Sequence, residues 1–273
     1  MFKDIIVNLS SERTTEFAVS VASLFQTHVA GVSFLYDPII LPVSRKEGIP
    51  IGLIEAQRLE NENRATGAKA KFDESVRRAG LSSESCIISS ELSEAANVFA
   101  RMARRFDLAV VGQAGSDKRT VDELIIEAAL FKSGRPVLVV PSIQKAKLSL
   151  NRVMVCWDGS CNVARAVSDA MPFLAKAKIV NLVTIVGKKG KSDEFAGADM
   201  AEHLARHGLN VELRRASAGH IQLADNLLSL AADLSADFMV MGGYGHSRLR
   251  EFVLGGATRG VLASMTVPTL MSH

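Results

Sequence analysis

The feature of this sequence that most constrains its fold is an internal duplication. The stretch FDLAVVGQAG at residues 106–115 aligns with ADFMVMGGYG at residues 236–245. Gly112 then falls on Gly242, an offset of 242 − 112 = 130. Two similar stretches at such a distance predict two copies of one structural unit in the chain.

The beginnings of the two copies also align, but at a different offset. IIVNLSS matches VMVCWDGS with Ser10 opposite Asp158, an offset of 158 − 10 = 148. The difference, 148 − 130 = 18 residues, predicts additional chain in the first copy. The proline-containing residues 37–54 have no steady period and are expected to be that segment, as a loop before a long helix. We therefore expect two domains, 1–145 and 146–273.

Short β-branched runs alternate with stretches of helical period in each copy. This pattern predicts an α/β fold with two tandem, doubly wound, five-stranded parallel-sheet domains. In the second copy the expected strands are 152–156, 179–186, 211–215, 238–241 and 267–270, and the expected helices are 162–174, 193–207, 221–234 and 247–264. Ligands of such sheets bind at the carboxyl ends of the strands, where the strand order reverses.

Composition limits the class of protein. A chain with 48% hydrophobic and 22% charged residues has the balance of a soluble globular protein. Its formal net charge of +3 is too small to indicate binding to nucleic acid or to a membrane. The sequence has no signal peptide and no apolar run long enough to span a bilayer, so a cytoplasmic protein is expected. The three cysteines do not form a disulfide pattern and are expected to be small buried or half-buried residues.

Glycines are concentrated in MGGYGHSRLREFVLGG, residues 241–256. Glycine at Gly242 and Gly245 permits positive φ and lets backbone N–H groups face a ligand. A second group, Gly255 and Gly256, precedes the Thr258 hydroxyl. Rows of N–H donors beside a helix amino terminus form an anion site, which suits the phosphates of a nucleotide. The alternative is that the glycines only permit close packing between helix and sheet.

The opening VMVCWDGS, the stretch MVMGGYGHSRLREFVLGGATRG and the closing VPTLM together resemble the universal stress protein family in its tandem form. The resemblance covers essentially the whole chain as two copies. It implies an adenine nucleotide alpha hydrolase-like fold, frequent dimerisation and, in many members, binding of ATP or a related adenine nucleotide, with or without Mg²⁺. The residues that it places at the nucleotide are Asp158, Ile185, Met241, Gly242, Tyr244, Gly245, Gly255, Gly256, Ala257 and Thr258.

The resemblance also implies roles for some of these residues. Asp158 corresponds to the acidic residue that contacts the adenosine, and Ile185 to the position whose main chain meets the base. The motif glycines hold the ribose and phosphates. The family has Ser or Thr where this chain has Gly256, and a hydroxyl bond to phosphate contributes about 1.5–3 kcal/mol. Without compensation by Thr258 or Arg248, the affinity would fall by about ten- to a hundredfold.

The first copy departs further from the motif. Ile125 and Ile126 stand where the second copy has Gly255 and Gly256, and Ser10 replaces the acidic residue. Branched side chains resist positive φ and would fill the phosphate space. The spacing of Val121, Leu124, Ile125 and Ala128 predicts an ordinary buried helix face instead. We expect this copy to bind no nucleotide and to act as a structural partner.

Two further patterns suggest chemistry but are weaker. VGKKGKS at residues 186–192 imitates the end of a P-loop, but it is too short to surround a phosphate chain. Asp199, His203 and His207 share one expected helix face without a visible fourth metal ligand, so a solvated face is expected.

No catalytic constellation can be assembled from the sequence, so at most slow ATP hydrolysis is expected. The leading hypothesis is a stress-response or regulatory protein that binds an adenine nucleotide. The rivals are a nucleotide-free interaction protein and a weak ATPase. The two last strands, beginning near Pro136 and Pro268, are expected to pair and form an intramolecular pseudo-dimer, while homodimerisation and the protein partner stay open.

Overall fold

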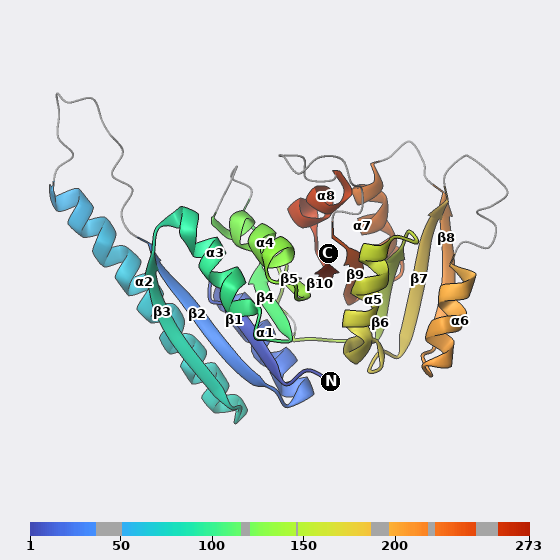
Figure 1. The fold of residues 1–273 in the computed structure, drawn as a ribbon, viewed down its shortest axis with the longest axis horizontal. Helices are drawn as coiled ribbons and strands as arrows, with labels where there is room; N and C mark the ends of the chain where they lie inside the picture. Colours follow the sequence, from blue (N-terminus) through green and yellow to red (C-terminus); the bar gives the residue numbers. More distant parts are fainter. Residues whose placement is uncertain (37–50, 116–120, 146, 187–196, 218–221, 244–255) are drawn as a thin grey trace.

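Ten strands form one continuous sheet in this chain, with helices packed on both of its faces (Figure 1). The computed structural model describes residues 1–36, 51–115, 121–145, 147–186, 197–217, 222–243 and 256–273. The elements before residue 145 are β1 (Asp4–Asn8), α1 (Glu12–Phe25), β2 (His28–Tyr36), α2 (Ile51–Ala79), β3 (Ser83–Ser90), α3 (Leu92–Ala103), β4 (Leu108–Gly112), α4 (Val121–Lys132) and β5 (Val137–Val140). The elements after it are β6 (Arg152–Trp157), α5 (Cys161–Leu174), β7 (Ile179–Val186), α6 (Ala198–Arg206), β8 (Val211–Ser217), α7 (Leu223–Asp233), β9 (Phe238–Gly242), α8 (Gly256–Ser264) and β10 (Thr269–Ser272).

The strand order shows how the two copies join. It runs β3-β2-β1-β4-β5-β10-β9-β6-β7-β8, and neighbouring strands are parallel within each copy. The expected pairing of the two closing strands is observed: β5 and β10 are antiparallel, with Thr269 opposite Val139 and Met271 opposite Val137. The tandem, doubly wound α/β fold expected from the sequence is therefore confirmed.

A repeated aspartate contact reproduces both sequence offsets. The Asp107 carboxylate accepts the backbone N–H of Lys3 at 2.7 Å, at the start of β1. The Asp237 carboxylate accepts the N–H of Asn151 at 2.9 Å, at the start of β6. The aspartates differ by 237 − 107 = 130 and their partners by 151 − 3 = 148. In both copies the start of the first strand is thus held by the same hydrogen bond to an aspartate.

The hydrophobic core lies on both faces of the sheet. Side chains of α1, α2, α5 and α6 cover one face, and those of α3, α4, α7 and α8 cover the other. The first face is continuous between the copies because Phe2 and Phe25 lie against Phe173, with ring centroids 5.2 and 5.0 Å away. Phe173 in turn stacks on Phe238 at 4.7 Å. This aromatic cluster joins the two copies through buried apolar surface.

The extra segment of the first copy contains helix where a loop was expected. Residues 37–54 were assigned to a loop, but α2 begins at Ile51. Its sequence is rich in Ala, Leu, Glu, Lys and Arg, which favour helix. As a result α2 has 29 residues, against 9 in α6. Residues 37–50 lie outside the described residues.

In the second copy the elements occur near their expected positions. The strand β7 has the expected bounds, whereas β10 begins at Thr269 because Pro268 has no N–H for the ladder. Gly197, with φ 84°, precedes α6 and interrupts the expected helix 193–207, whose first residues are not described. Within the expected helix 247–264, the structure describes the part from Gly256 to Ser264 as α8.

Two predictions about burial are wrong. Leu124 is 37% exposed, because α4 turns Ile125, Ala128 and Ala129 toward the core instead. Cys161 is exposed because it is the first residue of α5, while Cys86 and Cys156 are half-buried. All three thiols are free. Among the described helices, none has both the length and the apolar character needed to cross a membrane.

Candidate functional site

The strand order of the second copy reverses between β6 and β9. The chain passes from β6 to β7 and β8 on one side, and β9 and β10 then lie on the other. Cys156 on β6 is paired with Met241 on β9, so Asp158 and Gly243 follow adjacent strand ends. This is the switch point at which doubly wound sheets bind ligands. Two of the expected site positions, Asp158 and Gly242, are therefore brought together.

Asp158 lies exposed in the turn between β6 and α5. Its Oδ1 accepts the N–H of Ser160 at 2.8 Å, and Gly159 supplies the positive φ of 76° that the turn needs. Ser160 caps α5 by accepting the N–H of Val163 at 3.3 Å. Burial, followed by the Asp158 charge, raises the pKa of the Cys156 thiol to about 12. A carboxylate and a helix amino terminus thus share one exposed turn.

Gly242 of the motif and the neighbouring Gly243 have a packing role. A Cβ at Gly242 would lie 2.8 Å from the backbone nitrogen of Val163. A Cβ at Gly243 would lie 2.7 Å from Cδ2 of Leu130, which belongs to α4 of the first copy. Any side chain at either position would displace a neighbour. This contact supports the packing interpretation of Gly242 and identifies Gly243 as part of the junction between the copies.

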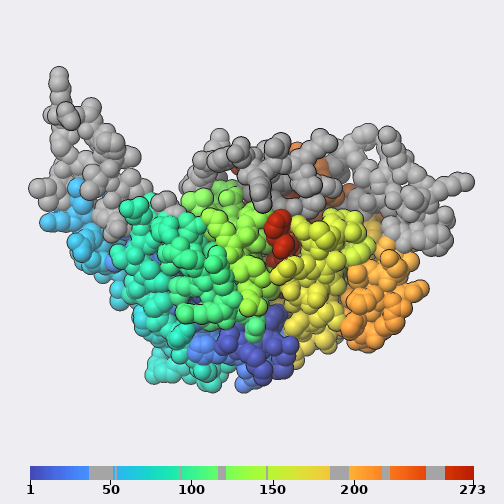
Figure 2. Space-filling model, viewed as in Figure 1, coloured from blue at the N-terminus to red at the C-terminus, as the bar shows by residue number. Residues whose placement is uncertain are grey.

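Asn162 and His273 contact the end of β9, and neither was identified from the sequence. Asn162 donates from Nδ2 to the carbonyl oxygen of Gly243 at 2.7 Å. Nδ1 of His273 lies 3.1 Å from the same oxygen and 3.0 Å from Asn162 Nδ2. The His273 ring also meets Phe131 edge-on at 4.8 Å. Figure 2 shows the carboxyl terminus between the green and yellow parts of the two copies.

The beginning of α8 holds three of the expected site residues. Gly256 is exposed, and a Cβ added there would meet no described atom within 4 Å. Ala257 is half-buried and Thr258 is buried. Described packing thus gives no reason for glycine at Gly256, in contrast to Gly242. The Thr258 hydroxyl is not exposed on the described surface, and its contact with phosphate stays a prediction.

The remaining expected positions are only partly described. Ile185 lies at the end of β7, where it pairs with Ala216 of β8. Tyr244, Gly245 and Gly255 lie outside the described residues, as does the P-loop-like stretch after Val186.

His203 of α6 and His207, which follows the helix, lie together on the surface. His203 and His207 are exposed and their ring centroids are 4.8 Å apart. Among the described residues, no three His, Cys, Asp or Glu side chains are grouped so that they could hold a metal ion.

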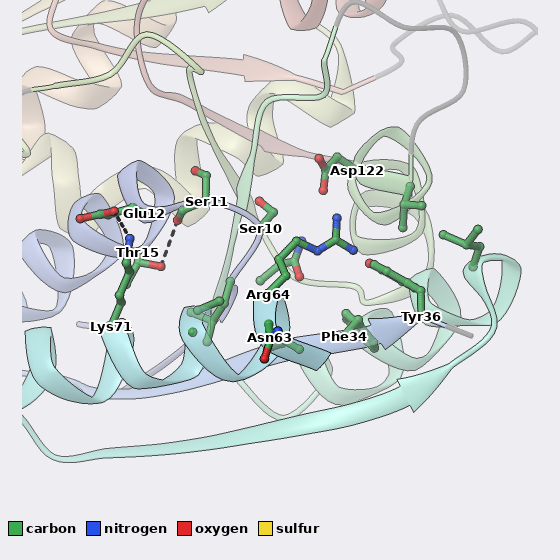
Figure 3. A pocket seen from close by; sticks show the side chains of 18 residues that line it. Ser10, Ser11, Glu12, Thr15, Phe34, Tyr36, Asn63, Arg64, Lys71 and Asp122 are labelled. Carbon is green, nitrogen blue, oxygen red and sulfur yellow. Dashed lines mark hydrogen bonds and ion pairs between the residues drawn. The ribbon is translucent and has the colours of Figure 1, made fainter. Parts of the chain in front are cut away.

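The first copy has an open cavity at its own strand ends. It has a volume of about 570 Å³ and lies at the carboxyl ends of β1 and β2, between α2 and the start of α4 (Figure 3). Ser10, the counterpart of Asp158, lines it. Ile125 is buried in the core as expected, and Ile126, which did not belong to the expected helix face, is buried there as well. This cavity was not predicted from the sequence.

Comparisons with known proteins agree with the family resemblance. No family model matches the chain. A universal stress protein of Synechocystis sp. is 27% identical over 175 residues, which span 60% of this chain and 57% of that protein. The aligned region thus covers little more than half of that relative.

Solved structures extend the likeness to the whole chain. A universal stress protein from Archaeoglobus fulgidus covers 98% of this chain and 97% of its own, with a TM-score of 0.70 and 16% identity. A functionally unknown protein from Pseudomonas aeruginosa covers 99% and 92%, with a TM-score of 0.64 and 14% identity. A universal stress protein in complex with cAMP covers 51% of this chain and 97% of its own, with a TM-score of 0.36 and 15% identity. The resemblance of this chain to the universal stress proteins, in their tandem two-copy form, is confirmed in sequence and in fold.

Proposed function

We propose that this chain is a stress-response or regulatory protein that binds ATP or a related adenine nucleotide in its second domain, residues 146–273. The observation that carries the proposal is the position of Asp158 beside the end of β9, at the switch point of the sheet. In this proposal the first domain, residues 1–145, binds no nucleotide and supports the second through the shared sheet.

The charges and backbone groups at this position suit the two ends of a nucleotide. The exposed Asp158 carboxylate can accept hydrogen bonds from ribose hydroxyls. The amino termini of α5 and α8 each carry a partial positive charge from the helix dipole, which favours phosphate. The open space around Gly256 lets backbone approach a ligand there. In this proposal Asp158 contacts the adenosine, and the amino termini of α5 and α8 contact the phosphates.

A calorimetric titration of the whole chain with ATP tests the proposal. The unmodified protein is expected to bind ATP, and Asp158→Ala is expected to weaken binding by about tenfold or more, because a charge-assisted hydrogen bond is lost. Ser10→Ala is the matched control, since Ser10 occupies the equivalent position in the first domain. No heat from the unmodified protein would refute the proposal, and equal losses in both variants would contradict the assignment to the second domain.

The packing of Gly242 and Gly243 favours a second candidate, a nucleotide-free interaction protein. Here the glycines serve only the contacts with Val163 and Leu130. This candidate predicts that Gly243→Ala lowers the thermal stability of the chain, while ATP produces neither heat nor a change in melting temperature. ATP-dependent stabilisation of the unmodified chain would exclude it.

A further inference from the structure

The cavity of the first copy has the size and lining of a small-molecule site. Its volume of about 570 Å³ lies within the usual range for such sites. The aromatic rings of Phe34 and Tyr36, stacked with centroids 6.1 Å apart, form one wall, and Leu92 adds apolar surface. Ser10 and Ser11 contribute hydroxyls at the β1 end. The cavity therefore offers an apolar wall and polar groups at one edge.

Charged residues of both signs line this cavity in equal number. The cations are Arg64 and Lys71, and the carboxylates are Glu12 and Asp122, so the formal charges cancel. Lys71 and Glu12 neutralise one another, with Nζ and Oε2 2.5 Å apart. The second pair differs, because Arg64 and Asp122 make no ion pair within 4.0 Å with any described residue.

Arg64, Tyr36 and Asp122 converge from three different elements. Figure 3 shows their side chains turned toward one another from α2, β2 and the start of α4. The Arg64 guanidinium carbon lies 5.7 Å from the centroid of the Tyr36 ring. Within the described part of the chain, no hydrogen bond is formed by the guanidinium, the phenol oxygen or the Asp122 carboxyl. Tyr36 and Asp122 are half-buried, and Arg64 is exposed beside them. Half-buried polar groups without a hydrogen-bond partner are costly, so this edge is suited to a ligand that satisfies the phenol and the carboxyl.

Burial at this edge also changes the pKa values of Asp122 and Tyr36. Burial raises the pKa of the Asp122 carboxyl, and the Arg64 charge opposes that increase. Burial, followed by the Asp122 charge, raises the pKa of Tyr36 to about 12. The phenol therefore stays protonated and can donate a hydrogen bond to an anionic ligand group.

The charges in the cavity disfavour a polyphosphate. Glu12 stands in the first turn of α1, and Ser11 already accepts the N–H of Thr14 at 3.1 Å. The lining has no net positive charge to offset several phosphate charges, and Ser11 already occupies one of the N–H groups at the amino terminus of α1. A ligand with one positive and one negative group, and no net charge, matches the lining better.

We propose that this cavity binds a small zwitterion with an apolar side chain, of the α-amino acid or dipeptide class. The Arg64 guanidinium would bind the ligand carboxylate with two parallel N–H donors, as its planar geometry favours. The Tyr36 hydroxyl would donate to the same carboxylate, and Asp122 would accept from the ammonium group. The apolar side chain would lie along Phe34 and Leu92. Binding here is independent of nucleotide binding by the second copy.

Calorimetric titration of the whole chain with L-leucine and L-leucyl-L-leucine tests this proposal. At least one zwitterion is expected to bind. Isocaproate lacks the ammonium group and isoamylamine lacks the carboxylate, so both are expected to bind at least about tenfold more weakly. Absence of heat from both zwitterions at millimolar concentration would overturn the proposal, and so would an affinity for either analogue that equals the affinity for the zwitterion.

Variants assign the binding to these residues. Arg64→Gln and Asp122→Asn each keep the approximate shape of the side chain and are expected to weaken zwitterion binding by about tenfold or more. Arg58→Gln is the control, since Arg58 lies on the same helix but pairs with Glu62 at 3.1 Å outside the cavity. Unchanged affinity in both cavity variants would contradict the assignment. ATP binding is expected to be the same in Arg64→Gln as in the unmodified chain, and a loss of ATP affinity in that variant would show a nucleotide site here instead.

Discussion

Gln113, at the end of β4, donates from its side-chain Nε2 to the carbonyl oxygen of Leu262 in α8 at 2.9 Å. The same nitrogen lies 3.1 Å from the carbonyl oxygen of Ala263, and Gln113 Oε1 accepts the N–H of Ser142 at 2.9 Å. One side chain of the first copy thus satisfies carbonyls at the end of the helix that opens with Gly256 in the second.

Replacing this side chain tests its contribution to the junction. Gln113→Ala is expected to lower the free energy of unfolding by about 1–3 kcal/mol, because half-buried backbone groups lose their partners. Urea denaturation monitored by circular dichroism measures the change. Gln57→Ala, at an exposed position of α2, is the control and is expected to change stability by less than about 0.5 kcal/mol. Equal stability of the two variants would show that the Gln113 contacts contribute nothing.

The aromatic cluster gives a second test of how the copies are held together. Phe173 is fully buried against three other rings, so Phe173→Ala is expected to cost about 3–5 kcal/mol of unfolding free energy. Phe131 is 43% exposed and meets the His273 ring edge-on. Phe131→Ala is therefore expected to cost about 1 kcal/mol or less. Similar losses in the two variants would contradict the assigned role of the cluster.

Thiol labelling tests the exposure of the cysteines in β6 and α5, next to the proposed nucleotide site. Cys161 is exposed and is expected to react first with iodoacetamide at mildly alkaline pH. Cys156 is expected to react slowly, because burial and the Asp158 charge raise its pKa to about 12 and keep the reactive thiolate rare. Its labelling rate should rise as the pH approaches that value. Mass spectrometry of peptides after timed labelling measures both rates, and faster reaction of Cys156 would contradict the described burial.

The fold could be predicted because the type and order of its strands and helices follow from short stretches of sequence. Strand and helix periods, and two offsets, were enough to place the tandem sheets, and the contacts of Asp107 and Asp237 confirm the offsets. The helix bounds were less accurate where one residue decides them, as Gly197 does before α6.

The sites required information that local patterns do not contain. Arg64 and Asp122 are 122 − 64 = 58 residues apart and meet only because α2 and α4 flank the same strand ends. Asn162 and His273 contact the end of β9 through the tertiary arrangement of the two copies. Glycine spacing alone also could not separate the packing role of Gly242 from the open surroundings of Gly256.

The most direct test of nucleotide binding by the second domain uses Gly256→Ser. No described atom lies within 4 Å of a Cβ added at Gly256, and a serine hydroxyl there would restore a hydrogen bond to phosphate worth about 1.5–3 kcal/mol. Calorimetric titration with ATP is therefore expected to give a dissociation constant about ten- to a hundredfold lower for Gly256→Ser than for the unmodified chain. An ATP affinity that is unchanged or weaker in this variant would contradict the placement of the phosphates at α8.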